Sequence, residues 1–139
     1  AAVGIEGIEA FRHIFDTRKK NLVYLMKGVA DLADRFHILK EEKHEVISPH
    51  AFSLVLRKGA KIDYKKLYKH LEDRGMQVKT CFASLPTQHK VFKFLGYKKG
   101  DFPEAEFVGD NGLHVGCHQY LNRSDLDYFL GVLHGYLKK

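Results

Sequence analysis

Residues 51–82 read AFSLVLRKGAKIDYKKLYKHLEDRGMQVKTCF, and this stretch decides the fold. Its first six residues, 51–56, are apolar and β-prone and are followed by a Lys-Gly turn, which predicts a strand. Asp63 is then placed to cap the start of a helix over residues 64–74. The glycine that follows residue 74 marks the end of this helix. Residues 76–82 alternate with a period of two, which predicts a second strand. This strand, helix, strand order indicates a mixed α/β domain.

The segments on either side extend this pattern. Residues 5–36 carry apolar residues at steps of three, four or seven, which predicts one continuous helix. At about 1.5 Å per residue its N-terminal half should project toward another domain or subunit. Downstream we expect short helices over residues 89–95 and 103–108, a strand over 113–116, and a helix that begins at a Ser cap and covers 124–137. The predicted fold is a small two-layer α/β sandwich in which helices cover a three-stranded sheet.

Size and composition limit the class of protein. With 139 residues, 45% hydrophobic and 29% charged, the chain has the length of one domain and a globular composition. It contains no run of about 20 apolar residues, and its start lacks a secretory h-region. Two cysteines, Cys81 and Cys117, favour a reducing compartment, although one disulfide is compatible with the sequence. We therefore expect a cytoplasmic protein without a membrane partner.

The basic charge is unevenly distributed. Lys and Arg number 23 against 17 Asp and Glu, a formal net charge of +6. Residues 57–79 hold eight basic and three acidic residues, a local excess of five. Such a surface can attract nucleic acid, anionic lipid or a phosphorylated small molecule, so a basic nucleic-acid-binding module is one hypothesis. An ordinary solvated helix face is the simpler interpretation. A third hypothesis is a structural domain that dimerises through its long helix.

Residues 112–120, Gly-Leu-His-Val-Gly-Cys-His-Gln-Tyr, hold the densest group of chemically active side chains. His114, Cys117 and His118 are residue types that bind zinc, but their spacing differs from common zinc motifs. Strand alternation also sends His114 and Cys117 to opposite faces. A reactive thiol at Cys117 or Cys81 would need an orienting group and an oxyanion hole, which the sequence does not show. We favour a strand end where glycines allow a ligand or another backbone to approach closely.

A second polar segment follows the second predicted strand. Residues 80–89, Thr-Cys-Phe-Ala-Ser-Leu-Pro-Thr-Gln-His, enter a proline-braced turn. Such a turn can form the rim of a site for a polar ligand such as a sugar, or it is an ordinary capped turn. The sequence has neither a phosphate-binding Gly-Lys-Ser/Thr loop nor a Gly-x-Gly-x-x-Gly fingerprint. These residues alone predict a soluble α/β domain without a complete catalytic set.

Three blocks of sequence, taken in order, resemble one family. They are AAVGIEGI at the start with RKKN at residues 18–21, LPTQH with LGYKKGDFPEAE between 85 and 106, and NGLHVGCHQYL with DLDY between 111 and 128. They resemble the interdomain helix, the sugar-side loop and the last strand and helix of the DegT/DnrJ/EryC1/StrS group. Members of this group are pyridoxal-phosphate-dependent sugar aminotransferases and dehydratases with the aspartate aminotransferase fold type I. Glu6 or Gly7 stands where the family often has Gln.

The resemblance spans nearly all 139 residues and implies a domain organisation. Residues 1–36 would form a long interdomain helix, and residues 37–139 a small C-terminal α/β domain. The large N-terminal domain, which in this family carries the Schiff-base lysine and most cofactor contacts, is absent from this sequence. The resemblance therefore implies pyridoxal phosphate in the intact enzyme, with no cofactor bound, no catalytic residue and no activity in this fragment alone.

The same resemblance implies a function and a set of site residues. We expect part of a nucleotide-sugar aminotransferase of polysaccharide or lipopolysaccharide sugar biosynthesis, with the nucleotide-sugar 3-dehydratase branch as the alternative. The domain would form the substrate-side wall of the active site, contact its own N-terminal domain and belong to a homodimer. The sequence does not define the sugar, the nucleotide or the amino donor. The residues that the resemblance assigns to substrate binding are Phe82, Ser84, Gln88, His89 and His118.

Overall fold

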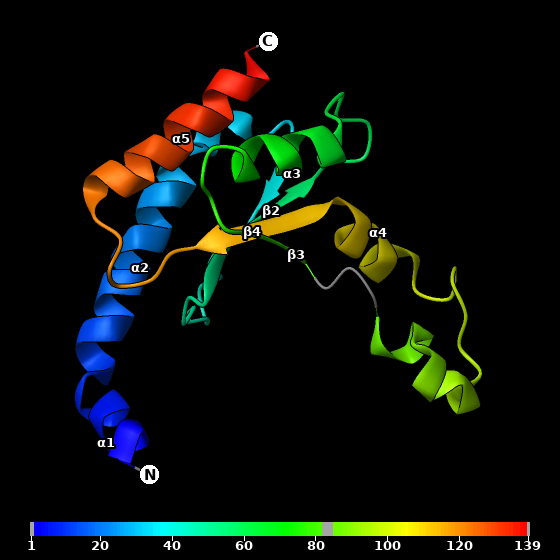
Figure 1. Cartoon of the computed structure of the whole chain (residues 1–139), viewed down its shortest axis with the longest axis horizontal. Helices are drawn as coiled ribbons and strands as arrows, with labels where there is room; N and C mark the ends of the chain where they lie inside the picture. The colour runs from blue at the N-terminus through cyan, green and yellow to red at the C-terminus, as the bar shows by residue number, and fades with distance from the viewer. Residues whose placement is uncertain (1, 82–84, 139) are drawn as a thin grey trace.

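A four-stranded antiparallel sheet lies at the centre of the domain (Figure 1). The computed structural model describes residues 2–81 and 85–138. The strand order is β1-β2-β4-β3, so β2 and β4 are the central strands and every neighbouring pair is antiparallel. The strands span Phe36–Ile38 (β1), Ala51–Leu56 (β2), Val78–Thr80 (β3) and Gly112–Gly116 (β4).

Three helices, α2, α3 and α5, cover one face of this sheet. Leu22, Leu67 and Leu133, one from each helix, are fully buried in the core. Asp63 caps α3, because its side chain accepts a hydrogen bond from the backbone N–H of Lys66. Among the described helices, none is long and apolar enough to cross a bilayer. The helices are Ala2–Glu9 (α1), Phe11–Gly28 (α2), Tyr64–Glu72 (α3), Pro103–Asn111 (α4) and Arg123–Leu137 (α5), with 3-10 turns at Ala30–Leu32 (η1), Pro86–Gln88 (η2) and Lys90–Leu95 (η3).

The two faces of the sheet differ in burial. In β2, Phe52 and Leu54 face the helices and are fully buried, whereas Ser53 and Val55 face the opposite side and are half-buried. Helix α4 lies near one end of that opposite side, where Val55 and Phe107 line the same hollow. We call the remainder of that side the open face. The side chains of its described strand residues are half-buried or exposed, so a ligand or a partner can contact this surface.

The mixed α/β architecture predicted from the sequence is confirmed, with one strand more than the three expected. The predicted single helix over residues 1–36 is wrong in two respects: α1 and α2 are separate helices divided at Ala10, and α2 ends at Gly28 and is followed by η1 and β1. Val29, Leu32 and Phe36 keep the helical spacing and are all buried, because the turn and the edge strand return them to the same core. Apolar spacing alone therefore does not mark the end of this helix.

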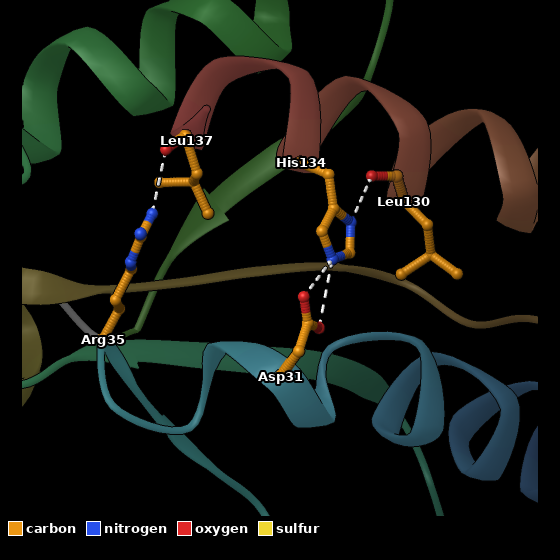
Figure 2. Close-up of polar contacts among 5 residues, drawn as sticks. All are labelled: Asp31, Arg35, Leu130, His134 and Leu137. Atoms are coloured by element: carbon orange, nitrogen blue, oxygen red, sulfur yellow. Dashed lines mark hydrogen bonds and ion pairs between the residues drawn. The ribbon is translucent and has the colours of Figure 1, made fainter. Parts of the chain in front are cut away.

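Polar contacts fix the C-terminal helix to the turn after α2 (Figure 2). Nε2 of His134 in α5 lies 3.2 Å from both carboxylate oxygens of Asp31 in η1, and Nδ1 lies 2.8 Å from the backbone oxygen of Leu130. Arg35 donates a hydrogen bond of 2.9 Å to the backbone oxygen of Leu137, which satisfies a carbonyl group at the helix end. These contacts join residues 31–35 to the C-terminal helix, about 100 residues later in the sequence.

Residues 85–102 include η2 and η3 and extend away from the sheet (Figure 1). We call this segment the arm. All its residues from 89 to 101 are exposed, including large apolar side chains such as Phe94. Oε1 of Glu106 in α4 accepts hydrogen bonds from Nε2 of Gln88 at 2.6 Å and from the backbone N–H of Gly100 at 2.8 Å. One carboxylate therefore ties the beginning and the end of the arm to α4.

Candidate functional site

A row of polar side chains crosses three strands on the open face. Ser53 in β2 pairs in register with His114 in β4, and His114 pairs with Lys79 in β3. Paired residues of neighbouring strands point to the same side of a sheet, so these three side chains share the open face. Lys79 is exposed, and the other two are half-buried. The row therefore presents a hydroxyl, an imidazole and an ammonium group side by side.

A hollow of about 270 Å³ lies where β4 ends. The imidazole rings of His50 and His114 meet there with their centroids 6.3 Å apart. Gly116 has no side chain, and a Cβ at its position would lie 3.3 Å from Cδ2 of His118. We call this space the basic hollow. Its lining residues are Arg18, His50, Ala51, Gln77, Lys79, His114, Gly116 and His118.

The basic hollow has an excess of positive charge. Arg18 and Lys79 are cations, and none of the described lining residues is acidic. Within the described part of the chain, neither cation forms an ion pair with a carboxylate. Burial lowers the pKa of His114, and the nearby His50 and Lys79 lower it further by charge repulsion. The hollow therefore suits an anion, which would supply the missing negative charge.

Helix α2 fixes the loop that carries His118. The side-chain amide of Asn21, which is buried, donates hydrogen bonds to the backbone oxygens of Cys117 at 3.4 Å and His118 at 3.0 Å. Three residues earlier, Nε of Arg18 donates a hydrogen bond of 3.0 Å to Oε1 of Gln119. These bonds satisfy buried carbonyl groups and hold the loop against α2. The Arg-x-x-Asn pattern thus positions both the loop and one cation of the basic hollow.

The two thiols are structural. Cys117 is fully buried, Cys81 is nearly so, and burial raises the pKa of both thiols. Sγ of Cys81 lies 4.0 Å from Nδ1 of His114, but a raised pKa keeps the thiol protonated at neutral pH. As expected, His114 lies on the open face and Cys117 in the core. Over residues 2–81 and 85–138, no three metal-binding side chains come close enough together to hold an ion.

The residues predicted for substrate binding fall into separate places. Gln88 and His89 lie at the base of the arm, and His118 lines the basic hollow. The arm and the loop with His118 lie at opposite ends of β4 (Figure 1), so the structure does not gather these residues at one point. Phe82 and Ser84 lie outside the described residues.

Sequence reasoning missed three residues that the fold brings to His118. Arg18 comes from α2, His50 directly precedes β2, and Lys79 lies in β3. The sequence pattern indicates His114 only as a candidate zinc ligand. The signal that could have grouped Lys79 with His114 is the pairing of β3 with β4, which a single sequence does not specify.

The basic stretch over residues 57–79 is divided by the fold. Lys58 and Lys69 form exposed ion pairs with carboxylates at 2.7 and 2.8 Å. Lys79, at the end of the stretch, lies on the open face with His114. Exposed pairs of this kind are typical of a solvated surface, so they favour that interpretation over nucleic-acid binding.

A comparison with family models decides the classification. The model of the DegT/DnrJ/EryC1/StrS aminotransferase family matches residues 1–134. The chain belongs to this family. The match runs from the first helix to the last one, and it confirms the resemblance carried by the three sequence blocks.

Two curated relatives in this family are GDP-4-keto-6-deoxy-D-mannose 3-dehydratases. That of Escherichia coli O55:H7 (strain CB9615 / EPEC) is 26% identical over 134 residues, and that of Yersinia pseudotuberculosis is 28% identical over 140 residues. The alignments cover 95% and 99% of this chain but 34% of each relative, so the chain spans about a third of their length. A crystal structure of GDP-4-keto-6-deoxymannose-3-dehydratase with a trapped PLP-glutamate geminal diamine matches with a TM-score of 0.82 and 25% identity, covering 95% of this chain and 34% of that one.

Homologues in this family depend on pyridoxal phosphate, but the lining of the basic hollow is unlike a site for the whole cofactor. Sites for whole ligands have volumes of about 300–1,000 Å³ and mostly apolar linings. The basic hollow, at about 270 Å³, lies at the lower end of this range, and its lining is mainly basic and polar, with Ala51 as its only described aliphatic side chain. We therefore assign no step of the cofactor's chemistry to these residues.

Proposed function

We propose that these 139 residues form the C-terminal domain of a larger pyridoxal-phosphate-dependent enzyme that modifies a nucleotide sugar. The observation that carries this proposal is a family match over residues 1–134, and the alignments with the two curated relatives, each covering 34% of the relative, give the size of the missing part. A part that corresponds to about a third of its relatives would need the rest of the enzyme to act. The N-terminal helical segment would lead from the large domain into the small domain, residues 37–139.

The apolar surface at the N-terminal end supports docking onto that large domain. Val3, Ile5 and Ile8 in α1 and Phe11 at the start of α2 are 57–83% exposed. A helical segment that exposes several large apolar side chains normally packs them against another surface. We assign the chain's own N-terminal domain as this surface, and a second copy of the enzyme, in a homodimer, as the further partner.

In this proposal the open face forms the substrate-side wall of the active site. His118 borders it at the basic hollow, and Gln88 and His89 border it at the base of the arm. The family resemblance assigns Phe82 and Ser84 to substrate binding as well. Pyridoxal phosphate supplies the electron sink when it is bound in the whole enzyme, while this domain binds and orients the substrate.

The curated relatives favour the 3-dehydratase branch over the aminotransferase branch that the sequence resemblance put first. Both relatives, and one of the crystal structures that match at 25% identity, are named as 3-dehydratases of a GDP-linked 4-keto-6-deoxymannose. We therefore propose a GDP-linked 4-keto-6-deoxy sugar as the substrate class and removal of its 3-hydroxyl as the reaction. A nucleotide-sugar aminotransferase is the second candidate, because the family is described by that activity. A place in polysaccharide or lipopolysaccharide sugar biosynthesis stays a prediction.

Product analysis with the complete gene product tests the proposal. The enzyme is supplied with pyridoxal phosphate, nitrogen-15-labelled L-glutamate and GDP-4-keto-6-deoxy-D-mannose. A 3-dehydratase yields a sugar that has lost the oxygen at C3 and carries no label, whereas an aminotransferase yields a labelled amino sugar. Mass spectrometry distinguishes the two products. A gene product that retains no pyridoxal phosphate and forms neither product would overturn the proposal.

A further inference from the structure

The basic hollow collects five nitrogen-bearing side chains from separate parts of the chain. Arg18 lies in α2, His50 precedes β2, Lys79 lies in β3, His114 lies in β4 and His118 lies in the next loop. Only the tertiary structure brings them together, since no two of them are neighbours in the sequence. Their common property is the ability to donate hydrogen bonds from nitrogen, and the three imidazoles can also become cationic.

Protein carboxylates do not compensate this charge. In the part of the chain that the structure describes, Lys58 and Lys69 lie within 2.8 Å of a carboxylate oxygen, whereas Arg18 and Lys79 have no such partner. Burial, and then charge repulsion from His50 and Lys79, lower the pKa of His114 and so disfavour its protonated form. A bound anion would offset this repulsion and accept the hydrogen bonds.

The fold holds these groups in place without a ligand. The ladder between β3 and β4 sets Lys79 beside His114. Arg18 is fixed by its hydrogen bond to Gln119, and Nδ1 of His118 accepts a hydrogen bond of 3.3 Å from the backbone N–H of Tyr120. Donors that are already ordered lose less conformational entropy when a ligand binds.

We infer that the basic hollow binds a phosphate-class anion. Arginine and lysine are the usual donors to phosphate oxygens, and imidazole and amide N–H groups add to them. At about 270 Å³, the hollow takes the anionic group of a larger molecule rather than the whole molecule. Two sources have this chemistry, the diphosphate of a nucleotide sugar and the phosphate of pyridoxal phosphate. Naming the nucleotide sugar rests on the proposed function, whereas the anion site itself does not.

Titration of the 139-residue chain, which has its own buried core, tests the site. Inorganic pyrophosphate is added while the histidine ring signals are followed by NMR. We expect His50, His114 and His118 to shift together and saturably, and His13, which is outside the hollow, to stay unchanged. Parallel titrations with GDP, guanosine and pyridoxal phosphate identify the source. GDP binding without guanosine binding shows that phosphate is recognised, and the tighter of GDP and pyridoxal phosphate is the assigned ligand.

Charge-matched variants separate a built site from general attraction. Lys79→Ala should weaken pyrophosphate binding about tenfold, and Lys79→Arg should restore most of it. Lys65→Ala removes the same charge from an exposed position on α3 and should leave the affinity unchanged. Equal weakening by both alanine variants, or no saturable shift at the three histidines, would overturn the inference. Either result leaves the proposed function standing, because the products of the complete enzyme test that separately.

Discussion

The side-chain amide nitrogen of the buried Asn21 lies 3.0 Å from the backbone oxygen of His118. The same amide donates a second hydrogen bond to the backbone oxygen of Cys117. We predict that Asn21→Leu lowers the free energy of unfolding by about 1–3 kcal/mol, because two carbonyl groups lose their donor. Chemical denaturation measures the change. Lys20→Ala, on an exposed neighbour in the same helix, should change it by less than about 0.5 kcal/mol, and equal losses would contradict the prediction.

Gly112 leaves no room for a side chain. A Cβ at this position would lie 2.5 Å from the backbone oxygen of Val108 and 2.8 Å from Cβ of Cys81. We expect Gly112→Ala to destabilise the domain by about 1–3 kcal/mol through overpacking. Gly131 in α5 is exposed, and a Cβ there would meet nothing within 4 Å, so Gly131→Ala should stabilise the domain by about 0.5–1 kcal/mol. Thermal unfolding should show shifts of opposite sign; shifts in the same direction would refute this account of Gly112.

The contact between Asp31 and His134 predicts a small pH-dependent part of the stability. The hydrogen bond from His134 lowers the pKa of Asp31 below its ordinary value of 3.8. A carboxyl with a lowered folded-state pKa stabilises the fold above its unfolded-state pKa, and this contribution is lost as the pH falls through the folded-state value. Because the Asp31 side chain is 65% exposed, Asp31→Asn should cost no more than about 0.5 kcal/mol near pH 5.

Urea unfolding at two pH values checks this prediction. The difference between the parent chain and Asp31→Asn should shrink as the lower pH is taken further below 3.8, and it should vanish once Asp31 is protonated in both the folded and the unfolded state. Asp16→Asn, at an exposed position of α2, should show no such pH dependence. A deficit in Asp31→Asn that persists undiminished at the lower pH would argue against the carboxylate as its cause.

Glu106 is predicted to control the order of the arm. Hydrogen bonds from the backbone N–H of Gly100 and from Gln88 lower the pKa of its carboxyl, with Gly100 contributing most. Glu106→Ala should therefore make cleavage within residues 89–101 severalfold faster, because the segment opens more often. Limited proteolysis with mass spectrometry maps the cut sites. Glu104→Ala, on the same helix, breaks only an exposed ion pair and should leave the cleavage rate unchanged; a matching increase would exclude a specific role for Glu106.

The place of His118 in the substrate wall is testable in the complete enzyme. We expect His118→Ala to raise KM for the nucleotide sugar about tenfold, because a hydrogen-bond donor is lost from the basic hollow. His44→Ala replaces an exposed histidine outside that hollow and should leave KM unchanged. Steady-state kinetics with both variants decides the question. Unchanged KM in His118→Ala would remove His118 from the wall.

Elements with strong local signals were predictable from the sequence. The strand over residues 51–56 is confirmed as β2, and Asp63 caps α3 as expected. The last helix also forms, but Asn122 rather than Ser124 is its cap, and Asp125 completes the capping box. The Ser124 hydroxyl instead donates a hydrogen bond to the Asn122 side chain. Several side chains near a helix start can act as caps, so the pattern indicates the helix better than its first residue.

Features that depend on tertiary pairing were not predictable. β1 has only three residues and forms through the pairing of Phe36 with Leu56. Nothing in its local sequence distinguishes it from the helical spacing of apolar residues that precedes it. The basic hollow has the same origin, because Lys79 meets His114 only in a sheet where β3 lies beside β4. Arg18 reaches this place only because α2 packs against the loop after β4.

The core and two residues of the proposed ligand site, His114 and Lys79, lie on opposite sides of one sheet. Phe52 and Leu54 hold the helices, while Ser53, His114 and Lys79 face away from them. Replacing a side chain on the open face leaves the apolar contacts of the core intact. Ligand preference can therefore diverge by single substitutions at little cost in folding, which gives this small domain room to evolve new specificities on an unchanged scaffold.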